Sequence, residues 1–391
     1  MLCISNMMFL SVLNSFYRLI LLTLLTVMVP YFAGGSDALP AVPGMPQIET
    51  SRSVSSTTQE ITYGAEFEFT NDWVNENHTN DSLRGNEGVA AKMMASQIRI
   101  KCAQLGCEVT EKPGKWTERD RFKTPEYLVT FTNGLWINIS YDPLCVEVQT
   151  KPMTLQQWKL NEAMIQEVVF KTANELNLEA RENRAGHFNI GIVSAFGSNK
   201  NVKQFLRFFV DYANHSELAS GILRKNWSTA MPLALQGFLS RFFLRVLVIK
   251  VYFGQIKTIE DASAFILKHI YRKHPQSERY SITHNQAINL KNARNLDQSD
   301  KPLEIRAVRA QKSVAEFIQL IEIFGSRISY TNQQTGPIKV NIPNAEKMSD
   351  EEALQRFNKY LTEAGNDPEN YKNLVPDKYF PSTAKSCLGL F

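Results

Sequence analysis

The sequence has few cysteines, and none of them is placed as in a zinc site. Its five cysteines are scattered and odd in number, and no two of them form a CxxC pair. This pattern supports neither a structural zinc ion nor a disulfide framework, and it permits a link between Cys102 and Cys107 without requiring one. The fold must therefore rest on a hydrophobic core, which a chain of 391 residues with 43% hydrophobic residues can form.

An excess of charge and the common catalytic signatures are also missing. The formal net charge of +4 comes from 43 basic and 39 acidic residues without a basic stripe, which argues against nucleic acid as a partner. The sequence has no P-loop, GxGxxG, HExxH or GxSxG pattern. Nucleotide binding by those loops and hydrolysis by serine or zinc enzymes therefore have no support.

A short apolar run marks the amino terminus as a targeting segment. Arg18 precedes the 14-residue run "LILLTLLTVMVPYF", and small residues follow it. The pattern predicts a signal peptide in residues 1–38 and an exported protein, with membrane contact only through this segment. The alternatives are an uncleaved anchor starting near Met7, or delivery into a host cytosol. Residues 39–60, rich in Pro, Ser and Thr, are expected to form a linker.

The folded domain is expected to span residues 61–330, with a C-terminal extension over residues 331–391. Strand character is found in "YLVTFT", "GLWINIS", "CVEVQT", "GHFNIGIV", "HNQAINL" and "PLEIRAV". The turn "YDPL" between the second and third of these segments indicates a hairpin. Apolar periodicity predicts helices over residues 88–105, 154–177, 201–213, 259–272 and 312–325.

Two of the helical segments carry more specific expectations. In the helix over 88–105, the apolar face is predicted to carry Val89, Met93, Ala95 and Ile98, and Gly106 ends the helix. The segment 231–255 is the most apolar part of the chain after the targeting segment, but three basic residues interrupt it. Long basic side chains can reach solvent from a buried helix, so this segment is predicted to be core rather than a membrane span.

The stretch "YGAEFEF" places acidic side chains at every second position of a predicted strand. Because side chains alternate across a strand, Glu66 and Glu68 leave on one face while Phe67 and Phe69 leave on the other. Two carboxylates about 5 to 7 Å apart repel each other by a few kcal/mol at an effective dielectric constant of about 20. The acidic face therefore needs water, a basic partner or a cation.

The same alternation recurs in three later strands. Their polar faces carry Glu147 and Gln149 in "CVEVQT", His187 and Asn189 in "GHFNIGIV", and Glu304 and Arg306 in "LEIRAV". Carboxylates and an imidazole suit a hard divalent cation such as Mg²⁺ or Mn²⁺, and an arginine suits a phosphoryl group. Each strand alone is more typical of a solvated face, but four of them together predict a shared acidic site.

These segments, in this order, resemble the amidoligase family. Members of this family are relatives of glutamine synthetase and glutamate–cysteine ligase in the carboxylate–amine ligase superfamily. The resemblance rests on "YGAEFEF", "INISYDPLCVEVQTKPMT", "GHFNIGI", "YSITHNQAINL" and "LEIRAVRAQKSVAEFIQLIEIF", and it covers about residues 61 to 325. It implies an α+β, glutamine-synthetase-like fold, in which a curved antiparallel β half-barrel carries helices on its convex face. It also implies ATP and Mg²⁺ as cofactors, with Mn²⁺ as an alternative.

The resemblance also implies roles for individual residues. The metal ligands would be Glu66, Glu68, Glu147, His187 and Glu304. His187 and Asn189 would lie near the nucleotide phosphates. Arg306 would meet the transferring phosphate, and it would form the catalytic set together with Glu68 and Glu304.

The implied reaction joins a carboxylate-bearing small molecule or peptide to an amine donor. ATP would first convert the carboxylate into an acyl phosphate, and the amine would then displace phosphate to leave an amide or peptide bond. Two alternatives remain open at this stage: a metal- or nucleotide-binding protein of the same fold without catalysis, and a phosphotransferase on the same scaffold. The sequence identifies neither substrate.

Overall fold

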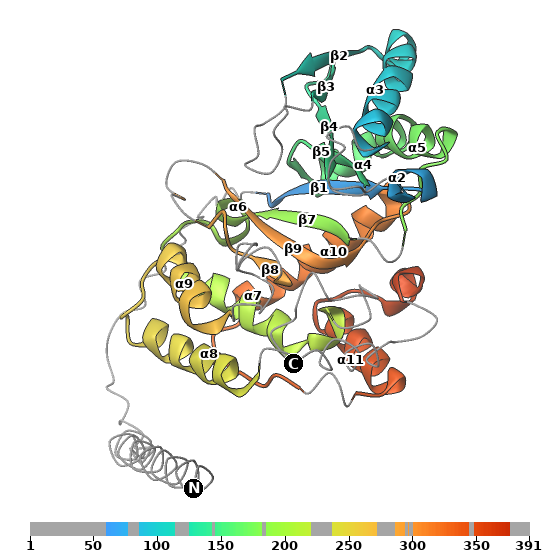
Figure 1. Cartoon of the computed structure of the whole chain (residues 1–391). Coiled ribbons are helices and arrows are strands. Elements are labelled where there is room, and N and C mark those ends of the chain that lie inside the picture. Colours follow the sequence, from blue (N-terminus) through green and yellow to red (C-terminus); the bar gives the residue numbers. More distant parts are fainter. Residues whose placement is uncertain are drawn as a thin grey trace, which may run out of the picture. The chain divides into compact units, whose positions relative to one another are not determined.

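A single antiparallel β-sheet organises the part of the chain that the structure, a computed structural model, describes (Figure 1). The described residues are 60–76, 86–113, 125–142, 145–181, 185–219, 237–271, 286–293, 296, 300–343 and 348–375. They belong to one compact unit, Thr58–Phe391. The predicted signal peptide, nearly all of the linker, part of the turn "YDPL" and residues 376–391 lie outside the described residues.

Within the described residues the sheet has nine strands: eight follow the order β2-β3-β4-β5-β1-β7-β9-β8, and the short β6 pairs with β1. The strands are β1 (Thr62–Phe69), β2 (Cys107–Lys112), β3 (Glu126–Phe131), β4 (Trp136–Asp142), β5 (Cys145–Thr150), β6 (Met153–Thr154), β7 (Ala185–Gly191), β8 (Ile288–Asn289) and β9 (Pro302–Arg309). All the pairings are antiparallel. The predicted α+β class with an antiparallel sheet is therefore confirmed.

Helices follow and separate the strands along the chain. They are α2 (Asp72–Glu76), α3 (Asn86–Leu105), α4 (Leu155–Ile165), α5 (Thr172–Glu175), α6 (Ile192–Phe196), α7 (Val202–Asn214), α8 (Gly237–Tyr252), α9 (Ile259–Phe265), α10 (Val314–Gln333) and α11 (Asp350–Glu363). The π-helical segments η1 (Gln166–Lys171) and η4 (Ile266–Ile270) continue α4 and α9, and η6 (Pro368–Leu374) is a 3₁₀ helix. Among the described residues, none of the helices is both long enough and apolar enough to cross a membrane.

The apolar face of the central strands packs against α4, η1 and α10. Phe67 of β1 contacts Phe170 of η1 with ring centroids 4.9 Å apart, and it contacts Phe317 of α10 at 5.4 Å. Phe188 of β7 lies 5.3 Å from the same Phe317 ring. Each such aromatic contact contributes about 0.5 to 1.5 kcal/mol beyond the area it buries. This cluster holds β1 and β7 side by side and leaves their other faces for polar groups.

Local signals in the sequence explain where the packing helices begin and how closely they approach the sheet. Thr154 and Gln157 form a capping box that starts α4, and Ser313 caps α10 by accepting from the Glu316 amide. Gly325 lets α10 approach the sheet, because a Cβ atom at this position would lie 2.5 Å from the Tyr63 hydroxyl. These features fix α10 against the apolar side of β1.

Most predicted elements occur within a few residues of their predicted ends. The predicted helix over 154–177 is α4, η1 and α5 in succession, and the one over 312–325 continues to Gln333. The predicted apolar face of α3 is wrong at two positions, because the side chains of Val89 and Met93 are exposed. The prediction is right for Ala95 and Ile98, and Ala91, Met94 and Cys102 complete the buried side of α3, at the spacing that faces one direction on a helix.

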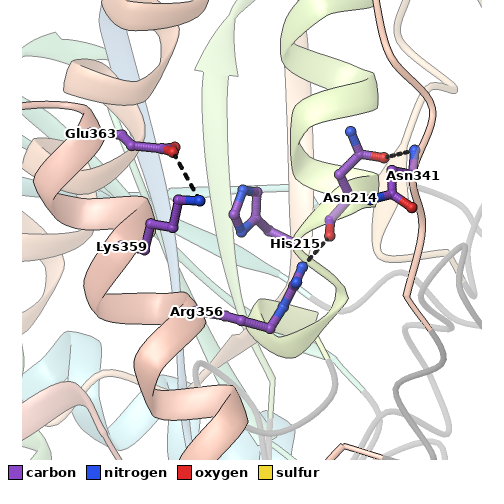
Figure 2. Close-up of a pocket in the computed structure, with 6 residues that line it drawn as sticks. All are labelled: Asn214, His215, Asn341, Arg356, Lys359 and Glu363. Carbon is purple, nitrogen blue, oxygen red and sulfur yellow. Dashed lines mark hydrogen bonds and ion pairs between the residues drawn. The ribbon is translucent and has the colours of Figure 1, made fainter.

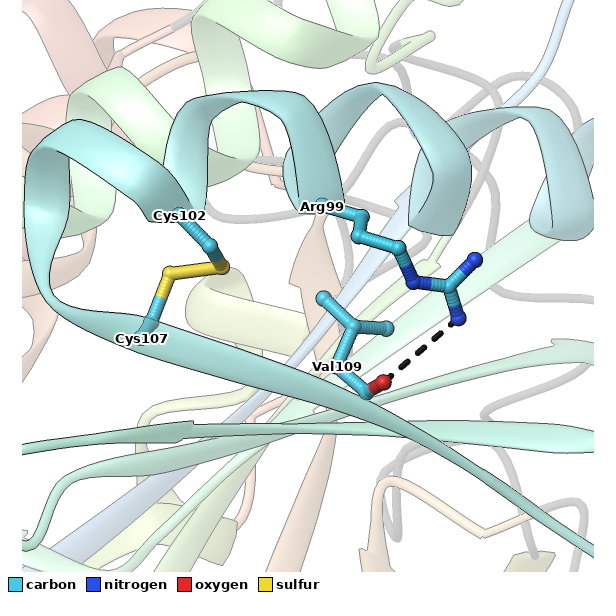
Figure 3. Close-up of a disulfide and its surroundings, with 4 residues drawn as sticks. All are labelled: Arg99, Cys102, Cys107 and Val109. Atoms are coloured by element: carbon cyan, nitrogen blue, oxygen red, sulfur yellow. Dashed lines mark hydrogen bonds between the residues drawn. A yellow bond between two sulfur atoms is a disulfide. The ribbon is translucent and has the colours of Figure 1, made fainter.

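A disulfide joins the end of α3 to the beginning of β2 (Figure 3). Cys102 and Cys107 are five residues apart, with Cα atoms separated by 4.6 Å. Gly106 makes the turn between them with a positive φ of 65°, a conformation that favours glycine. The link that the sequence permitted therefore closes the α3–β2 turn.

Buried ion pairs tie the described part of the C-terminal extension to α7 and α10. Arg327 of α10 donates to Asp211 of α7 at 2.6 and 2.7 Å, and to Glu363 of α11 at 3.0 Å. Arg356 of α11 pairs with the fully buried Glu217 at 3.0 Å. A pocket of about 180 Å³ lies at this junction. Figure 2 shows the residues that line it, namely Asn214, His215, Asn341, Arg356, Lys359 and Glu363. The pocket lies where α7 ends and α11 packs.

Candidate metal centre

Strand register brings the predicted polar residues together on one face of the sheet. Glu66 of β1 lies opposite His187 of β7, and Asn189 of β7 lies opposite Glu304 of β9. The β7–β9 pairing shifts register between Gly186 and Phe188, so His187 sits at an irregularity in the ladder. Such irregularities re-aim side chains, and they recur beside functional sites.

Three of the predicted ligands form a close group. His187 Nδ1 lies 2.6 Å from Glu66 Oε2 and 3.4 Å from Glu304 Oε1. One ligand atom from each of these residues falls within 4.8 Å of the others. The His187 and Glu304 side chains are buried, and Glu66 is half-buried. This is a compact set of two carboxylates and one imidazole drawn from three adjacent strands.

Two further predicted ligands lie next to this group. Glu68 is buried, and its Oε1 atom is 3.7 Å from the second ring nitrogen of His187. Glu147 of β5 lies directly opposite Glu68, and it accepts a hydrogen bond of 2.6 Å from Gln149. The structure therefore places all five predicted ligands on one face, with Glu147 at the edge of the cluster.

Hydrogen bonds fix the orientation of both carboxylates of the close group. Asn189 donates to Glu66 at 3.1 Å. Glu304 accepts from Arg306 at 2.6 Å and from Asn289 of β8 at 2.5 Å. Arg306 is itself buried on the same strand face as Glu304. Fixed ligands lose little conformational entropy on binding, so this arrangement favours a preorganised site.

The protonation states follow from these contacts. Burial lowers the pKa of His187, but the hydrogen bond and charge of Glu66 raise it, and the net pKa is about 9. Burial raises the pKa of Glu66, but the hydrogen bond and the charge of His187 lower it by more. The pKa of this carboxyl therefore lies below its usual value. Without a bound cation, the pair is therefore an imidazolium beside a carboxylate.

The donor set fits a divalent cation. Among the described residues, the buried Nε2 atom of His187 has no hydrogen-bond partner, which is costly unless the atom binds something else. Carboxylate oxygens with one imidazole suit Mg²⁺ or Mn²⁺ better than a thiol-binding metal. Glu66, His187 and Glu304 are the residues that could hold such an ion.

A hollow of about 160 Å³ opens beside Glu66 on the polar face. Asn189 and Gln149 line it together with Trp136, and Asp300 lines it near β9. Its volume is below the roughly 300 Å³ at which pockets begin to enclose drug-sized molecules. The hollow therefore suits a small polar group rather than a whole nucleotide.

Sequence reasoning missed two polar residues of this region. Asn289 lies in the predicted strand "HNQAINL", but nothing in its pattern indicates that its amide reaches Glu304. Asp300 caps α6 by accepting from the Val193 amide at 2.7 Å, and the sequence around it has no regular apolar spacing. The only available signal was the short polar interval before "PLEIRAV".

No protein-family model matches the chain, and no curated protein matches it either. The amidoligase resemblance therefore rests on the order of the strand segments and on the residues that these segments carry.

Proposed function

We propose that the chain is an ATP-dependent carbon–nitrogen ligase, an amidoligase that joins a carboxylate to an amine on a glutamine-synthetase-like half-barrel. The observation that carries this proposal is the close group of Glu66, His187 and Glu304 with Arg306 bound to Glu304 at 2.6 Å. Phosphoryl transfer is catalysed by a bound metal ion and a fixed positive charge next to each other, and this group offers ligands for the first and a guanidinium for the second.

Glu66, His187 and Glu304 would hold the catalytic metal, with Glu68 next to them. A bound Mg²⁺ or Mn²⁺ would supply positive charge to the phosphate oxygens of ATP. The donors come from three hydrogen-bonded strands, and their apolar faces are locked by packing. The ligand geometry is therefore set before any substrate binds.

Arg306 is the residue proposed to act on the transferring group. The substrate carboxylate forms a bond to the γ-phosphorus while the bond from phosphorus to the ADP oxygen breaks. Negative charge on the equatorial oxygens builds up in that step, and a buried guanidinium stabilises it without reorganisation. The amine nitrogen then attacks the acyl carbon, inorganic phosphate leaves, and the nitrogen gives up a proton.

The hollow beside Glu66 is proposed to receive the amine or the carboxylate. Its wall carries the carboxylate of Asp300 together with the amides of Asn189 and Gln149. The acidic wall of the hollow attracts an ammonium group. The two side-chain amides can donate hydrogen bonds to a substrate or accept them from it. A small amine is the occupant that this lining fits best.

The test is ATP-dependent phosphate release by the purified chain, screened against pools of acids and amines, with mass detection of an amide product. Arg306→Ala should lower turnover by roughly a hundredfold or more, the scale expected for removing a preorganised charge, while ATP affinity stays within about tenfold. Arg306→Lys should rescue only part of the turnover, because a lysine cannot reproduce the guanidinium fork.

Arg309 offers a matched control on the same strand. It donates to the Asn373 carbonyl at 2.8 Å and lies outside the cluster, so Arg309→Lys should leave turnover unchanged. Phosphate release without an amide product would instead indicate a phosphotransferase. ATP binding without phosphate release by the wild-type chain would indicate an inactive binding protein, and the ligase proposal would fail.

Export through the amino-terminal segment is also part of the proposal. The Cys102–Cys107 disulfide supports it, because disulfides persist mainly in oxidising compartments. The intact mass of the protein from its native source should correspond to a chain beginning near Ser36 or Leu39. A chain that retains Met1 or Met7 would instead favour an anchored or cytosolic protein.

A further inference from the structure

Helix α8 has two opposite stripes, and only one of them faces the core. The buried stripe follows helical spacing through Ser240, Leu244, Leu247 and Val251. The opposite stripe follows the same spacing through Phe238, Phe242, Arg245, Ile249 and Tyr252. The prediction that segment 231–255 is core is therefore right for only one side of the described helix.

Large apolar side chains lie in solvent on the outward stripe and next to it, at Leu239 and at Phe253, which directly follows α8. The exposed fractions are 69% for Phe238, 43% for Leu239, 41% for Ile249, 71% for Tyr252 and 63% for Phe253. The other exposed large hydrophobic side chains of the described residues are spread over four helices, namely α2, α3, α4 and α11. Apolar clusters of this kind on a surface mark contact with a partner or a membrane.

The charge on α8 has one sign. Between residues 237 and 257 the sequence contains Arg241, Arg245, Lys250 and Lys257 but no Asp or Glu. Helical spacing places Arg241 on one flank of the apolar stripe and Lys250 on the other, with the exposed Arg245 within it. Aromatic and aliphatic side chains bordered by basic ones are typical of helices that lie in a membrane interface.

We propose that α8 docks its outward stripe on an anionic lipid surface, with the helix axis in the plane of the membrane. The aromatic rings would enter the headgroup region, and the basic side chains would contact lipid phosphates. A second copy of the chain fits less well, because pairing two such stripes would bring the basic residues of both copies together. This inference does not depend on the proposed ligase activity.

Site-specific photo-crosslinking of the full chain tests this contact without interference from the amino-terminal segment. The photoreactive residue p-benzoylphenylalanine would replace Phe253 in one sample and Leu160 of α4 in another. Leu160 is the matched control, because it is also apolar and exposed (77%) but lies outside α8. Both samples would be irradiated with phosphatidylcholine vesicles that contain about one third phosphatidylserine, and the adducts would be identified by mass.

Position 253 should yield at least about tenfold more lipid adduct than position 160. Arg245→Gln should lower the yield at position 253 about fivefold, the effect expected for one basic residue near an anionic surface. Equal lipid yields at the two positions would overturn the proposal. Adducts at position 253 with a second copy, or with another segment of the same chain, would also overturn it, as would an unchanged yield in Arg245→Gln.

Discussion

The group of Glu66, His187 and Glu304 should make the thermal stability of the protein depend on Mg²⁺ or Mn²⁺. A ligand that binds only the folded state at a hundred times its Kd stabilises that state by about 2.7 kcal/mol. For a unit as long as Thr58–Phe391, average unfolding entropies convert this to a rise in Tm of about 4 °C. Differential scanning calorimetry across a metal titration measures this shift.

Replacing one carboxylate of the group should remove most of the rise. Glu66→Gln and Glu304→Gln each keep the side-chain shape but lose an anionic ligand, so we expect the metal affinity to fall roughly a hundredfold. At the same metal concentration the remaining stabilisation is about 0.4 kcal/mol, which is less than about 1 °C. The expected signature is a Tm shift that is large in the wild type and nearly absent in both variants.

Two controls keep the result interpretable. Glu304 accepts hydrogen bonds from Arg306 and Asn289, so its replacement also lowers the stability of the metal-free protein. Each shift must therefore be measured against the metal-free Tm of the same variant. Glu108→Gln is the matched control, because Glu108 is an exposed carboxylate on the edge strand β2 and is not among the predicted ligands. The assignment is refuted if the wild type shows no shift, or if Glu108→Gln loses as much of it as Glu304→Gln.

Three further predictions concern the scaffold that holds the site. Phe317→Ala should lower the free energy of unfolding by about 3 to 5 kcal/mol in a urea titration, because it opens a cavity beneath β1 and β7; a loss below about 1 kcal/mol would contradict the packing. Removing the disulfide with Cys102→Ser and Cys107→Ser should cost about 2 kcal/mol, and reductant should have no effect on this variant. Gly325→Ala should cost about 1 to 3 kcal/mol, and Tyr63→Phe should relieve part of that loss if the hydroxyl contact is its cause.

The central strands could be predicted from the sequence because alternation is a local property. Glu66 is followed two positions later by Glu68 in β1, and Glu304 by Arg306 in β9. The apolar residues between them, Phe67 and Ile305, are buried in the structure. The register that sets Glu66 opposite His187 depends on pairing between segments about 120 residues apart. A single sequence predicts the faces of these strands, but it does not predict the distances across them.

Two parts of the fold could not be predicted, because their pattern is set by the neighbouring structure. β2 is an edge strand with mostly exposed side chains, so its sequence "CEVTEK" has little apolar alternation to detect. In α3, Val89 and Met93 fit a helical period as well as the residues that are buried. Beside them, Ala90, Ala91 and Met94 are buried instead.

The two faces of the central strands explain how a costly polar cluster can persist in this fold. Glu68, Glu304 and Arg306 are buried charges, and well-packed apolar side chains in their place would often be equally or more stable. Directly behind them, Phe67 and Phe188 are fully buried against α10, which offsets the cost and stiffens the strands. A charge cluster of this kind on a rigid sheet keeps its geometry without a ligand. Because a preorganised site pays little reorganisation energy when charge develops, we infer that the cluster serves chemistry at the polar face rather than cohesion of the sheet.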